Sequence, residues 1–443
     1  MKLKLSVLFI WLVSQNIIAQ QGDNSPYSRI GLGDLKPESF VFSQQMGHTY
    51  SAFLDQYQIN IGNPASYASL NVTSFDLGIN AKRATLTQDD QSYNGWSGSF
   101  DYISLAFPLT NSINDLFERV KRDLRFGMGL TLRSVSSTSY NITTSEYQDG
   151  IGSFQRNYRG NGGTYEFMWG NAVKYKQYSF GVNLGYLFGK MEYDRNLFFP
   201  DNANAYINTF SNEYNISGFR MKLGLAYNLV LNKKKLEEGK SKHTNKLVFG
   251  LNYGLGTTAN TNLTESVITV RQGVGNAIES DTSSFDNIEG KLYIPSNLGV
   301  GISYFNGEKF ALSFDVSTGD WSKYYNEASK EVKGNLKNSL NVSTGGYYRP
   351  DLKSYKFRNR IFYRYGIFYQ KDGRVINDKQ LEQYGLTGGF GLPFIFQRKI
   401  SHASLGFEIG KKGINTPIQE KYFKITFGAT FNDDEWFLKR KYD

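Results

Sequence analysis

Histidine, the side chain most often used for catalysis near neutral pH, occurs at only three positions, His48, His243 and His402. These three are scattered along the chain and offer no spacing for a metal site or a catalytic dyad. Cysteine is absent, which excludes thiolate metal sites, cysteine nucleophiles and disulfides. The acidic run at residues 433–435 could bind a hard cation, but a solvated tail is the simpler interpretation. We therefore expect no catalytic residues, no metal and no cofactor, and a protein that is not an enzyme.

Charged residues that share one side of alternating segments are the more informative set. Alternation places six basic residues on the same inward side as Glu166, Asp315 and Glu408, namely Arg125, Arg133, Arg220, Lys222, Arg364 and Lys424. A basic wall of this kind could bind the carboxylate of an amphiphile through charge-assisted hydrogen bonds. The interpretation that we favour is that these groups pair with one another and with an N-terminal plug, which they hold in place.

The segments that carry these residues alternate between apolar and polar side chains with a period of two. In the last of them, residues 422–431, the apolar set is Phe423, Ile425, Phe427, Ala429 and Phe431, opposed by Tyr422, Lys424, Thr426, Gly428 and Thr430. Residues 124–133, 180–188, 219–227 and 247–255 follow the same pattern. Long strands with arginine and lysine opposite an unbroken apolar face indicate lipid outside and water inside.

Counting such segments gives the architecture. About fourteen of them start near residues 73, 98, 124, 163, 178, 215, 246, 290, 309, 336, 359, 383, 402 and 420, and bacterial single-chain barrels use even strand numbers. We predict an all-β fold, a transmembrane antiparallel β-barrel over residues 73–431. The composition agrees, with 33 Phe, 31 Tyr and 45 Gly but only 9 Pro, at a mean hydropathy of −0.45. A large soluble β-protein is the alternative.

The ends of the chain differ from the middle. Residues 1–20 combine Lys2 and Lys4, a short apolar core and Ala19, which predicts a secretory signal peptide, with a membrane anchor as the alternative. Residues 21–72 lack alternation and are rich in turn residues, which favours a plug, or hatch, inside the barrel over a floppy periplasmic leader. Residues 432–443 form a polar tail. Both termini are expected in the periplasm, and longer outer loops are expected near 134–162, 191–214 and 258–289.

Four motifs in order resemble the FadL-type family of outer-membrane long-chain fatty-acid transporters. They are residues 46–66, with Gly47 and the Asn63-Pro64-Ala65 turn of the hatch, then residues 294–301, Asp315 with 319–324, and residues 345–350. The resemblance covers nearly all of the mature chain. It implies a fourteen-stranded barrel with an N-terminal hatch, through which hydrophobic molecules pass without ATP or cofactor. The leading segment, residues 25–35, differs from that of the fatty-acid carriers.

Two functions follow from these observations. The first is passive passage of hydrophobic small molecules across the outer membrane of a Gram-negative bacterium. Its rival is a barrel that moves nothing and serves as a subunit of an outer-membrane assembly, secretion or surface-protein complex; a purely structural barrel ranks third. The expected partners are outer-membrane lipid, a hydrophobic small molecule and outer-membrane or periplasmic proteins, whereas location excludes nucleic acid.

The turns assigned to the periplasm are strongly basic. These turns are residues 109–123, 174–177, 232–246, 305–309, 349–359 and 395–402. With the tail they hold 21 Lys and Arg against 11 Asp and Glu, an excess larger than the net charge of about +8 left after the signal peptide is removed. The densest patch comprises Lys233, Lys234, Lys235, Lys240, Lys242 and Lys246. We hypothesise that this rim docks an acidic periplasmic partner; contact with phosphate headgroups of the inner leaflet or a role in solubility is the interpretation that we favour.

Charge reversal tests the docking rim. Substitution of Lys233, Lys234 and Lys235 by Glu is expected to reduce recovery of an acidic partner in a pull-down, because the field that steers it changes sign. Unchanged recovery of the complex contradicts the docking hypothesis.

Overall fold

The structure, a computed structural model, describes residues 25–110, 114–115, 119, 122–150, 152–201, 205–241, 243–272, 278–284, 288–396 and 399–436. The predicted signal peptide and residues 437–443 of the predicted tail lie outside the described residues. No described helix is long and apolar enough to cross a membrane.

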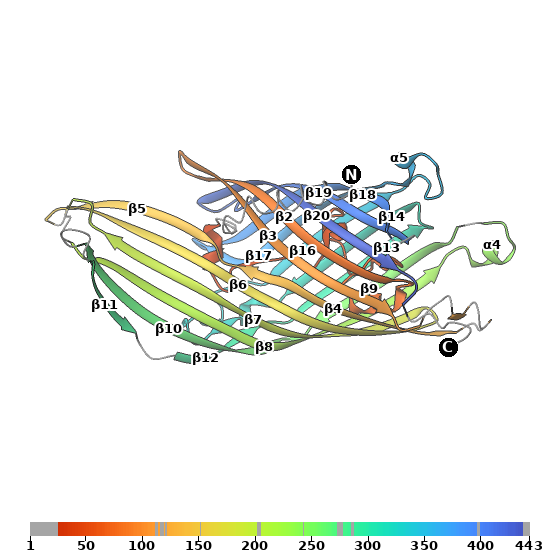
Figure 1. The fold of residues 1–443 in the computed structure, drawn as a ribbon, viewed down its shortest axis with the longest axis horizontal. Coiled ribbons are helices and arrows are strands. Elements are labelled where there is room, and N and C mark those ends of the chain that lie inside the picture. Colours follow the sequence, from red (N-terminus) through yellow and green to blue (C-terminus); the bar gives the residue numbers. More distant parts are fainter. Residues whose placement is uncertain are drawn as a thin grey trace, which may run out of the picture.

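Fourteen antiparallel strands of the described chain close into a barrel (Figure 1), which confirms the predicted fold. They are β2 (Thr73–Gln88), β3 (Gln91–Pro108), β4 (Leu124–Ser137), β6 (Gly152–Tyr175), β7 (Tyr178–Phe198), β8 (Ile207–Val230), β9 (Asn245–Gly254), β13 (Asn297–Asn306), β14 (Phe310–Gly319), β16 (Ser339–Tyr348), β17 (Phe362–Ile376), β18 (Lys379–Phe396), β19 (Lys399–Lys412) and β20 (Ile418–Asp433). Pairing of β20 with β2, from Thr73 opposite Asp433 to Gln88 opposite Ile418, closes the ring.

Alternation sorts the side chains of each strand between lipid and lumen. In β19, Ile409 is 62% exposed on the outer face, whereas Glu408 beside it is 4% exposed and points inward. A closed barrel leaves no unpaired strand edge in the membrane, so each strand of the wall pairs with a neighbour on both sides. The wall therefore separates an apolar exterior from a polar interior.

The segments expected to be long outer loops are largely strand, and that expectation is wrong. β6, β7 and β8 continue beyond the other strands and pair with β5 (Tyr140–Gln148) and β10 (Thr257–Gln272). β11 (Ile278–Ser284), β12 (Ile288–Ile294) and β15 (Tyr325–Asn326) complete this extension, which projects at one end of the barrel (Figure 1). The outer face of such strands meets water and carries polar side chains, so their sequences lack the apolar–polar alternation that marks strands in a bilayer.

Residues 25–72, the hatch segment, contain η1 (Pro26–Arg29), β1 (Asp34–Leu35), α2 (Val41–Gln44) and η2 (Pro64–Ser69). Apolar residues of this segment, among them Phe40, Met46, Phe53 and Ile59, are at most 2% exposed and belong to one core cluster with inward side chains of the wall. Phe40 stacks on Tyr102 of β3 with 3.6 Å between ring centroids. The hatch segment is thus folded against the inner face of the barrel.

Glycines on the inner face let the hatch backbone approach the wall closely. A Cβ at Gly250 would lie 1.8 Å from the Ser51 carbonyl oxygen, and one at Gly345 would lie 2.3 Å from that of Met46. Similar contacts meet the hatch at Gly127 of β4, Gly181 of β7, Gly224 of β8 and Gly366 of β17. Any larger side chain at these places would have to displace backbone. The high glycine content therefore serves hatch packing as well as turns.

Enlarging one of these glycines tests the packing. Gly250→Val is expected to destabilise the seated hatch by about 2 kcal/mol or more, because overpacking forces the backbone apart. Gly388→Val is the matched control, since the nearest atom to its Cβ, the Arg364 carbonyl oxygen, is 3.6 Å away. Limited proteolysis of the hatch measures the effect, and equal protection in both variants contradicts the packing role.

Candidate functional site

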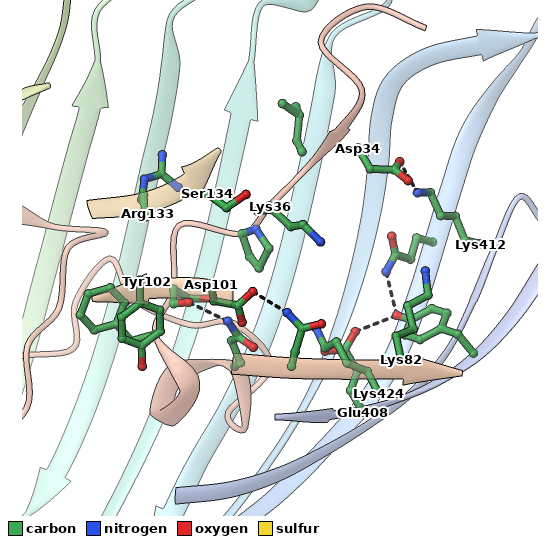
Figure 2. A pocket seen from close by; sticks show the side chains of 18 of the residues that line it. Asp34, Lys36, Lys82, Asp101, Tyr102, Arg133, Ser134, Glu408, Lys412 and Lys424 are labelled. Carbon is green, nitrogen blue, oxygen red and sulfur yellow. Dashed lines mark hydrogen bonds and ion pairs between the residues drawn. The ribbon is translucent and has the colours of Figure 1, made fainter. Parts of the chain in front are cut away.

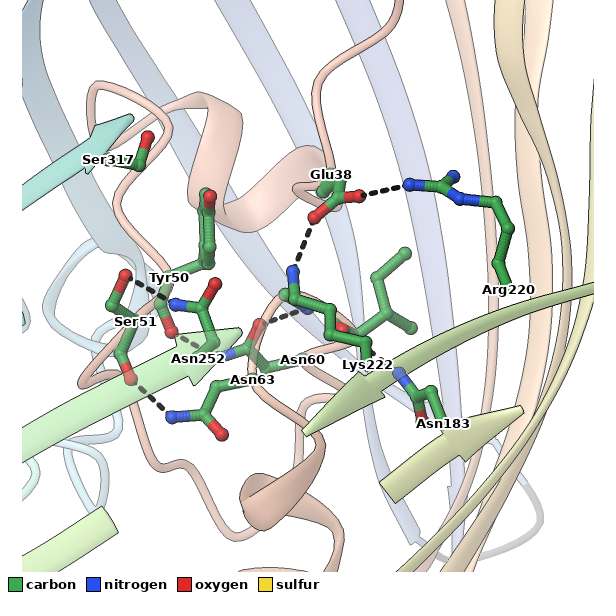
Figure 3. Close-up of polar contacts among 12 residues, drawn as sticks. Glu38, Tyr50, Ser51, Asn60, Asn63, Asn183, Arg220, Lys222, Asn252 and Ser317 are labelled. Atoms are coloured by element: carbon green, nitrogen blue, oxygen red, sulfur yellow. Dashed lines mark hydrogen bonds and ion pairs between the residues drawn. The ribbon is translucent and has the colours of Figure 1, made fainter. Parts of the chain in front are cut away.

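Glu38 of the hatch segment lies among three cations of the wall. It pairs with Lys222 and, at 3.9 Å, with Arg220 (Figure 3), and also with Arg133 at 3.3 Å. Arg133 and Arg220 also contact Glu166 of β6, at 2.9 Å and 3.3 Å. Two carboxylates and three cations thus form one network across β4, β6, β8 and the hatch.

The network fixes the charge state of Glu38. Burial alone would raise the pKa of this carboxyl, but Lys222, Arg133 and Arg220 together hold it well below its usual range. Glu38 is therefore ionised at neutral pH. Removal of its charge would leave three cations with a single carboxylate partner in a largely buried site, which is the costly way to break such a cluster.

Asp34 anchors a second network nearer the projecting end. It accepts a hydrogen bond from Lys412 Nζ (Figure 2) and another from Arg374 Nη1, each at 2.6 Å, and Arg374 also binds Asp372 at 2.6 Å. Burial acts to raise the pKa of Asp34, but the two cations overcome it and hold the pKa well below its ordinary value. Arg374 Nη1 further donates to the carbonyl oxygen of Tyr27 at 3.0 Å.

Further wall residues bind the middle of the hatch segment. Glu408 lies between His48 Nε2 at 3.2 Å and Lys424 Nζ at 2.6 Å. Arg364 Nη1 donates to Gln45 Oε1 at 3.0 Å, and one carboxylate oxygen of Asp315 accepts the backbone N–H groups of residues 50 and 51, at 2.7 Å and 2.6 Å.

The nine residues predicted to face the lumen all reach the hatch, directly or through one partner. Arg125, nearest the other end, donates to Asn71 Oδ1 at 3.1 Å. Arg133, Arg220, Lys222, Asp315, Arg364 and Glu408 contact hatch residues themselves, while Glu166 and Lys424 act through the partners named above. This arrangement matches the plug-seating interpretation of these charges.

The predicted hatch motif is a turn fixed to the wall. Asn63 Nδ2 donates to the Ser51 carbonyl at 2.6 Å and to that of Leu225 in β8 at 3.1 Å, while its Oδ1 accepts from Ala65 N. Pro64 begins η2, where its fixed φ suits the first helical position. Gly47, with a φ of 68°, donates its N–H to Thr387 Oγ1 at 2.8 Å.

The predicted docking patch divides into two places. Lys233, Lys234 and Lys235 lie on α4 (Lys233–Glu237), in an exposed hairpin beyond the wall, with Lys240 close by. Lys246 does not belong with them, because it points inward from β9 with Nζ 4.5 Å from the Phe305 ring centroid. β9 begins at Asn245, one residue before the predicted start at residue 246. Lys246 is therefore a strand residue, and the alternation of the strand turns its side chain inward although its charge resembles that of the neighbouring lysines. Lys242 lies outside the described residues.

The spaces between hatch and wall have mixed linings. One cavity of ≈ 260 Å³ combines the charged residues Glu38, Arg133, Asp315 and Glu408 with apolar ones such as Val135 and Phe368, and a second, more polar one of ≈ 110 Å³ is lined by Asp34, Lys82 and Lys412 among others (Figure 2). A hydrophobic ligand prefers a mostly apolar pocket with few polar groups. A more strongly apolar hollow, of ≈ 640 Å³, lies on the outer wall beside Leu386, Ile409 and Phe423. The described residues contain no cluster of three potential metal ligands.

Sequence reasoning missed the hatch acids and several of their partners. Glu38 and Asp34 lie in a segment without periodicity, so nothing indicated which way they point. Lys412 and Lys82 face inward from regular strands, and alternation would have found both. Asp372 and Arg374 lie between Lys371 and Val375, in a β-bulge where the register of β17 and β18 shifts and alternation fails.

Comparison with known proteins defines the family. A family model described as BamG matches residues 1–443. The chain belongs to the BamG family. No curated protein matched this BamG-family chain in sequence.

Solved structures similar to this BamG-family chain include toluene transporters and a monoaromatic hydrocarbon channel. The Pseudomonas putida toluene transporter TodX is 15% identical, with 91% of this chain and 99% of that chain covered and a TM-score of 0.54. The CymD monoaromatic hydrocarbon channel is 15% identical, with 91% of this chain and 98% of that chain covered and a TM-score of 0.53. A Pseudomonas aeruginosa FadL homologue is 10% identical, with 90% of this chain and 99% of that chain covered and a TM-score of 0.56. These values establish the FadL-type fold, confirm that resemblance and support an outer-membrane location.

Acidification tests the anchoring of the hatch. The pKa values of Glu38 and Asp34 are depressed by folding, so their contribution is present above the unfolded value of about 4 and is lost as the pH falls below it. The protection of hatch amides, measured as the observed hydrogen-exchange rate relative to the intrinsic rate at the same pH, should be high at pH 7 and should fall at pH 3. Protection that is equal at the two pH values contradicts the anchoring role.

Neutralisation tests the same anchor at constant pH. Glu38→Gln is expected to destabilise the seated hatch by about 3 kcal/mol. The matched control is Glu146→Gln, because Glu146 pairs with Arg156 at 2.8 Å on an exposed strand, where an ion pair contributes under about 1 kcal/mol. Protease protection of the hatch should fall in the first variant only.

Proposed function

We propose that this protein is a subunit of an outer-membrane protein complex, in which the barrel is a scaffold and the hatch segment a fixed core. The observation that carries the proposal is the seating of the hatch. Its acids pair with buried cations of the wall, and its backbone packs on inner-face glycines of β4, β7, β8, β9, β16 and β17.

The energetic cost of breaking the contacts between hatch and wall supports a hatch that stays in place. Moving it would separate the carboxylates of Glu38 and Asp34 from Lys222, Arg374 and Lys412, and each separation exposes an unpaired charge in a largely buried site. It would also uncover the apolar cluster around Phe40, Met46 and Phe53. These costs act together, because the contacts lie on one short, continuous segment.

Surfaces suited to protein partners lie at both ends of the barrel. At one end, α4 and α5 (Phe357–Arg360) carry Lys233, Lys234, Lys235, Arg358 and Arg360 beyond the wall (Figure 1). At the other end, β5, β10 and β11 extend the wall into a projecting sheet. A basic rim attracts an acidic partner through its field, in line with the docking rim predicted from the sequence.

Passage of hydrophobic small molecules is the second candidate. It is favoured by the fold shared with the TodX and CymD channels and by the apolar hollow on the outer wall. Inside the barrel, a hydrophobic molecule would have to enter charged cavities or displace the hatch. The two candidates therefore differ in whether the hatch must move.

A reversible lock on the hatch separates the two candidates. Asn252 Nδ2 of β9 donates to Ser51 Oγ of the hatch at 2.9 Å (Figure 3). The natural sequence contains no cysteine, so two introduced cysteines can pair only with each other. The double variant Ser51→Cys with Asn252→Cys should form a disulfide on oxidation and tie the hatch to the wall. Stoichiometric partner proteins should be recovered equally from native membranes in the oxidised and reduced states.

Uptake of toluene and of a long-chain fatty acid into proteoliposomes provides the second measurement, with Ser51→Cys alone as the control. A subunit should show no uptake that depends on the lock. Uptake that stops on oxidation, together with a barrel purified without stoichiometric partners, would replace the subunit proposal by passage.

A further inference from the structure

We propose that the outer wall carries a lipid site, in which a phosphorylated glycolipid with several acyl chains binds across β18, β19, β20 and β2. The site is the apolar hollow of ≈ 640 Å³ already described. Its lining includes Ile367, Leu386, Ile409 and Phe423, which face outward from neighbouring strands.

The hollow exists because two residues at its centre are glycines, which have no side chain to fill it. Gly385 and Gly410 are cross-strand partners in β18 and β19, and both lie in its lining. On the lumen side they are covered by Phe368 and Tyr422, whose rings lie 2.7 Å and 2.6 Å from where a Cβ would stand. The hollow is therefore a depression of the outer face that two aromatic rings close from within.

Three cations border the hollow: Arg83 of β2, Lys411 of β19 and Lys421 of β20. Lys411 and Lys421 are directly opposite each other in the register, an arrangement of like charges that destabilises a sheet unless an anion lies between them. All three point away from the lumen, whereas their neighbours Lys82, Lys412 and Tyr422 point into it. Within the described chain, none of the three has an ion pair or a side-chain hydrogen bond.

Charges nearby do not neutralise this cluster. Glu382, the outward acid of β18, lies 3.6 Å from Lys371 and is a partner of that lysine. Glu420, next to Lys421, points inward and pairs with Lys82. The cluster thus presents an uncompensated positive charge at the edge of an apolar hollow.

Aromatic residues place the cluster at the boundary between hydrocarbon and headgroups. Trp96 lies opposite Arg83 in the register and is 56% exposed, and Tyr384 lies opposite Lys411 and is 43% exposed. Tyrosine and tryptophan mark the interface in membrane barrels, with the aliphatic belt beyond them. Acyl chains would thus lie on Leu386, Ile409 and Phe423, and phosphates on the cations.

The spread of the cations selects the class of lipid. They occupy three adjacent strands spaced about 4.8 Å apart, so the cluster is about 10 Å wide, which exceeds one phosphate. It lies near the β2–β3 and β19–β20 hairpins, at the end where the strands project. Longer extensions of bacterial barrels face the cell exterior, so the leaflet is the outer one. A glycolipid with two phosphates and several acyl chains fits this position.

Native mass spectrometry of the full-length barrel in detergent tests the site. The probe is a synthetic bisphosphorylated, hexa-acylated glucosamine disaccharide; phosphatidylglycerol and inorganic phosphate are the comparators. The combined substitutions Arg83→Gln, Lys411→Gln and Lys421→Gln are expected to weaken binding of the probe by about tenfold or more, since each basic group near an anionic headgroup contributes. The matched control replaces Lys233, Lys234 and Lys235 by Gln, at the opposite end, and should bind normally.

A gel-mobility shift on heating verifies that each variant is folded, and the single variant Lys421→Gln replaces the triple variant if that one fails. Probe binding that is unchanged in the folded variant overturns the proposal. Tighter binding of phosphatidylglycerol than of the disaccharide also overturns it, as does saturation by inorganic phosphate alone. None of these outcomes depends on whether the barrel is a subunit or a channel.

Discussion

The pairing of hatch carboxylates with cations of the barrel wall is the interaction on which the rest of the interior depends. Glu38 neutralises part of a cluster that contains Lys222, Arg133 and Arg220, and the same cations balance Glu166 of the wall. Without the hatch, these three cations would share a single carboxylate, that of Glu166. The wall and the hatch are therefore electrostatically incomplete as separate parts, and each supplies what the other lacks.

This pairing has a steric counterpart. Charged side chains can meet their partners at short distances only because the hatch backbone lies directly on the wall, and glycines at positions such as Gly250 and Gly345 make that approach possible. The larger cavity that remains is lined in part by the same ion pairs. A fold shared with the TodX and CymD channels is here combined with a charged, closely packed interior.

The fold was largely predictable from the sequence. A bilayer imposes a period of two on every membrane strand, so the starts of β2, β4 and β7 were predicted at the residues where they occur. Strand lengths outside the bilayer were not predictable, because an outer face in water carries polar side chains and removes the pattern, and residues 134–162 therefore resembled loops. Inward charges such as Arg364 and Glu408 were also predictable, since alternation fixes the side of the wall to which a side chain belongs.

By itself the sequence determined which residues face lipid and which face the lumen, since that choice is local and repeats every second residue. Only the tertiary structure decided the partners. Glu38 and Lys222 are far apart in the chain, and the hatch has no periodicity that would orient Glu38 toward β8. The same holds for Lys411 and Lys421, whose juxtaposition depends on the register of β19 and β20. Register and long-range contact follow from closure of the barrel around the hatch, which no single segment contains.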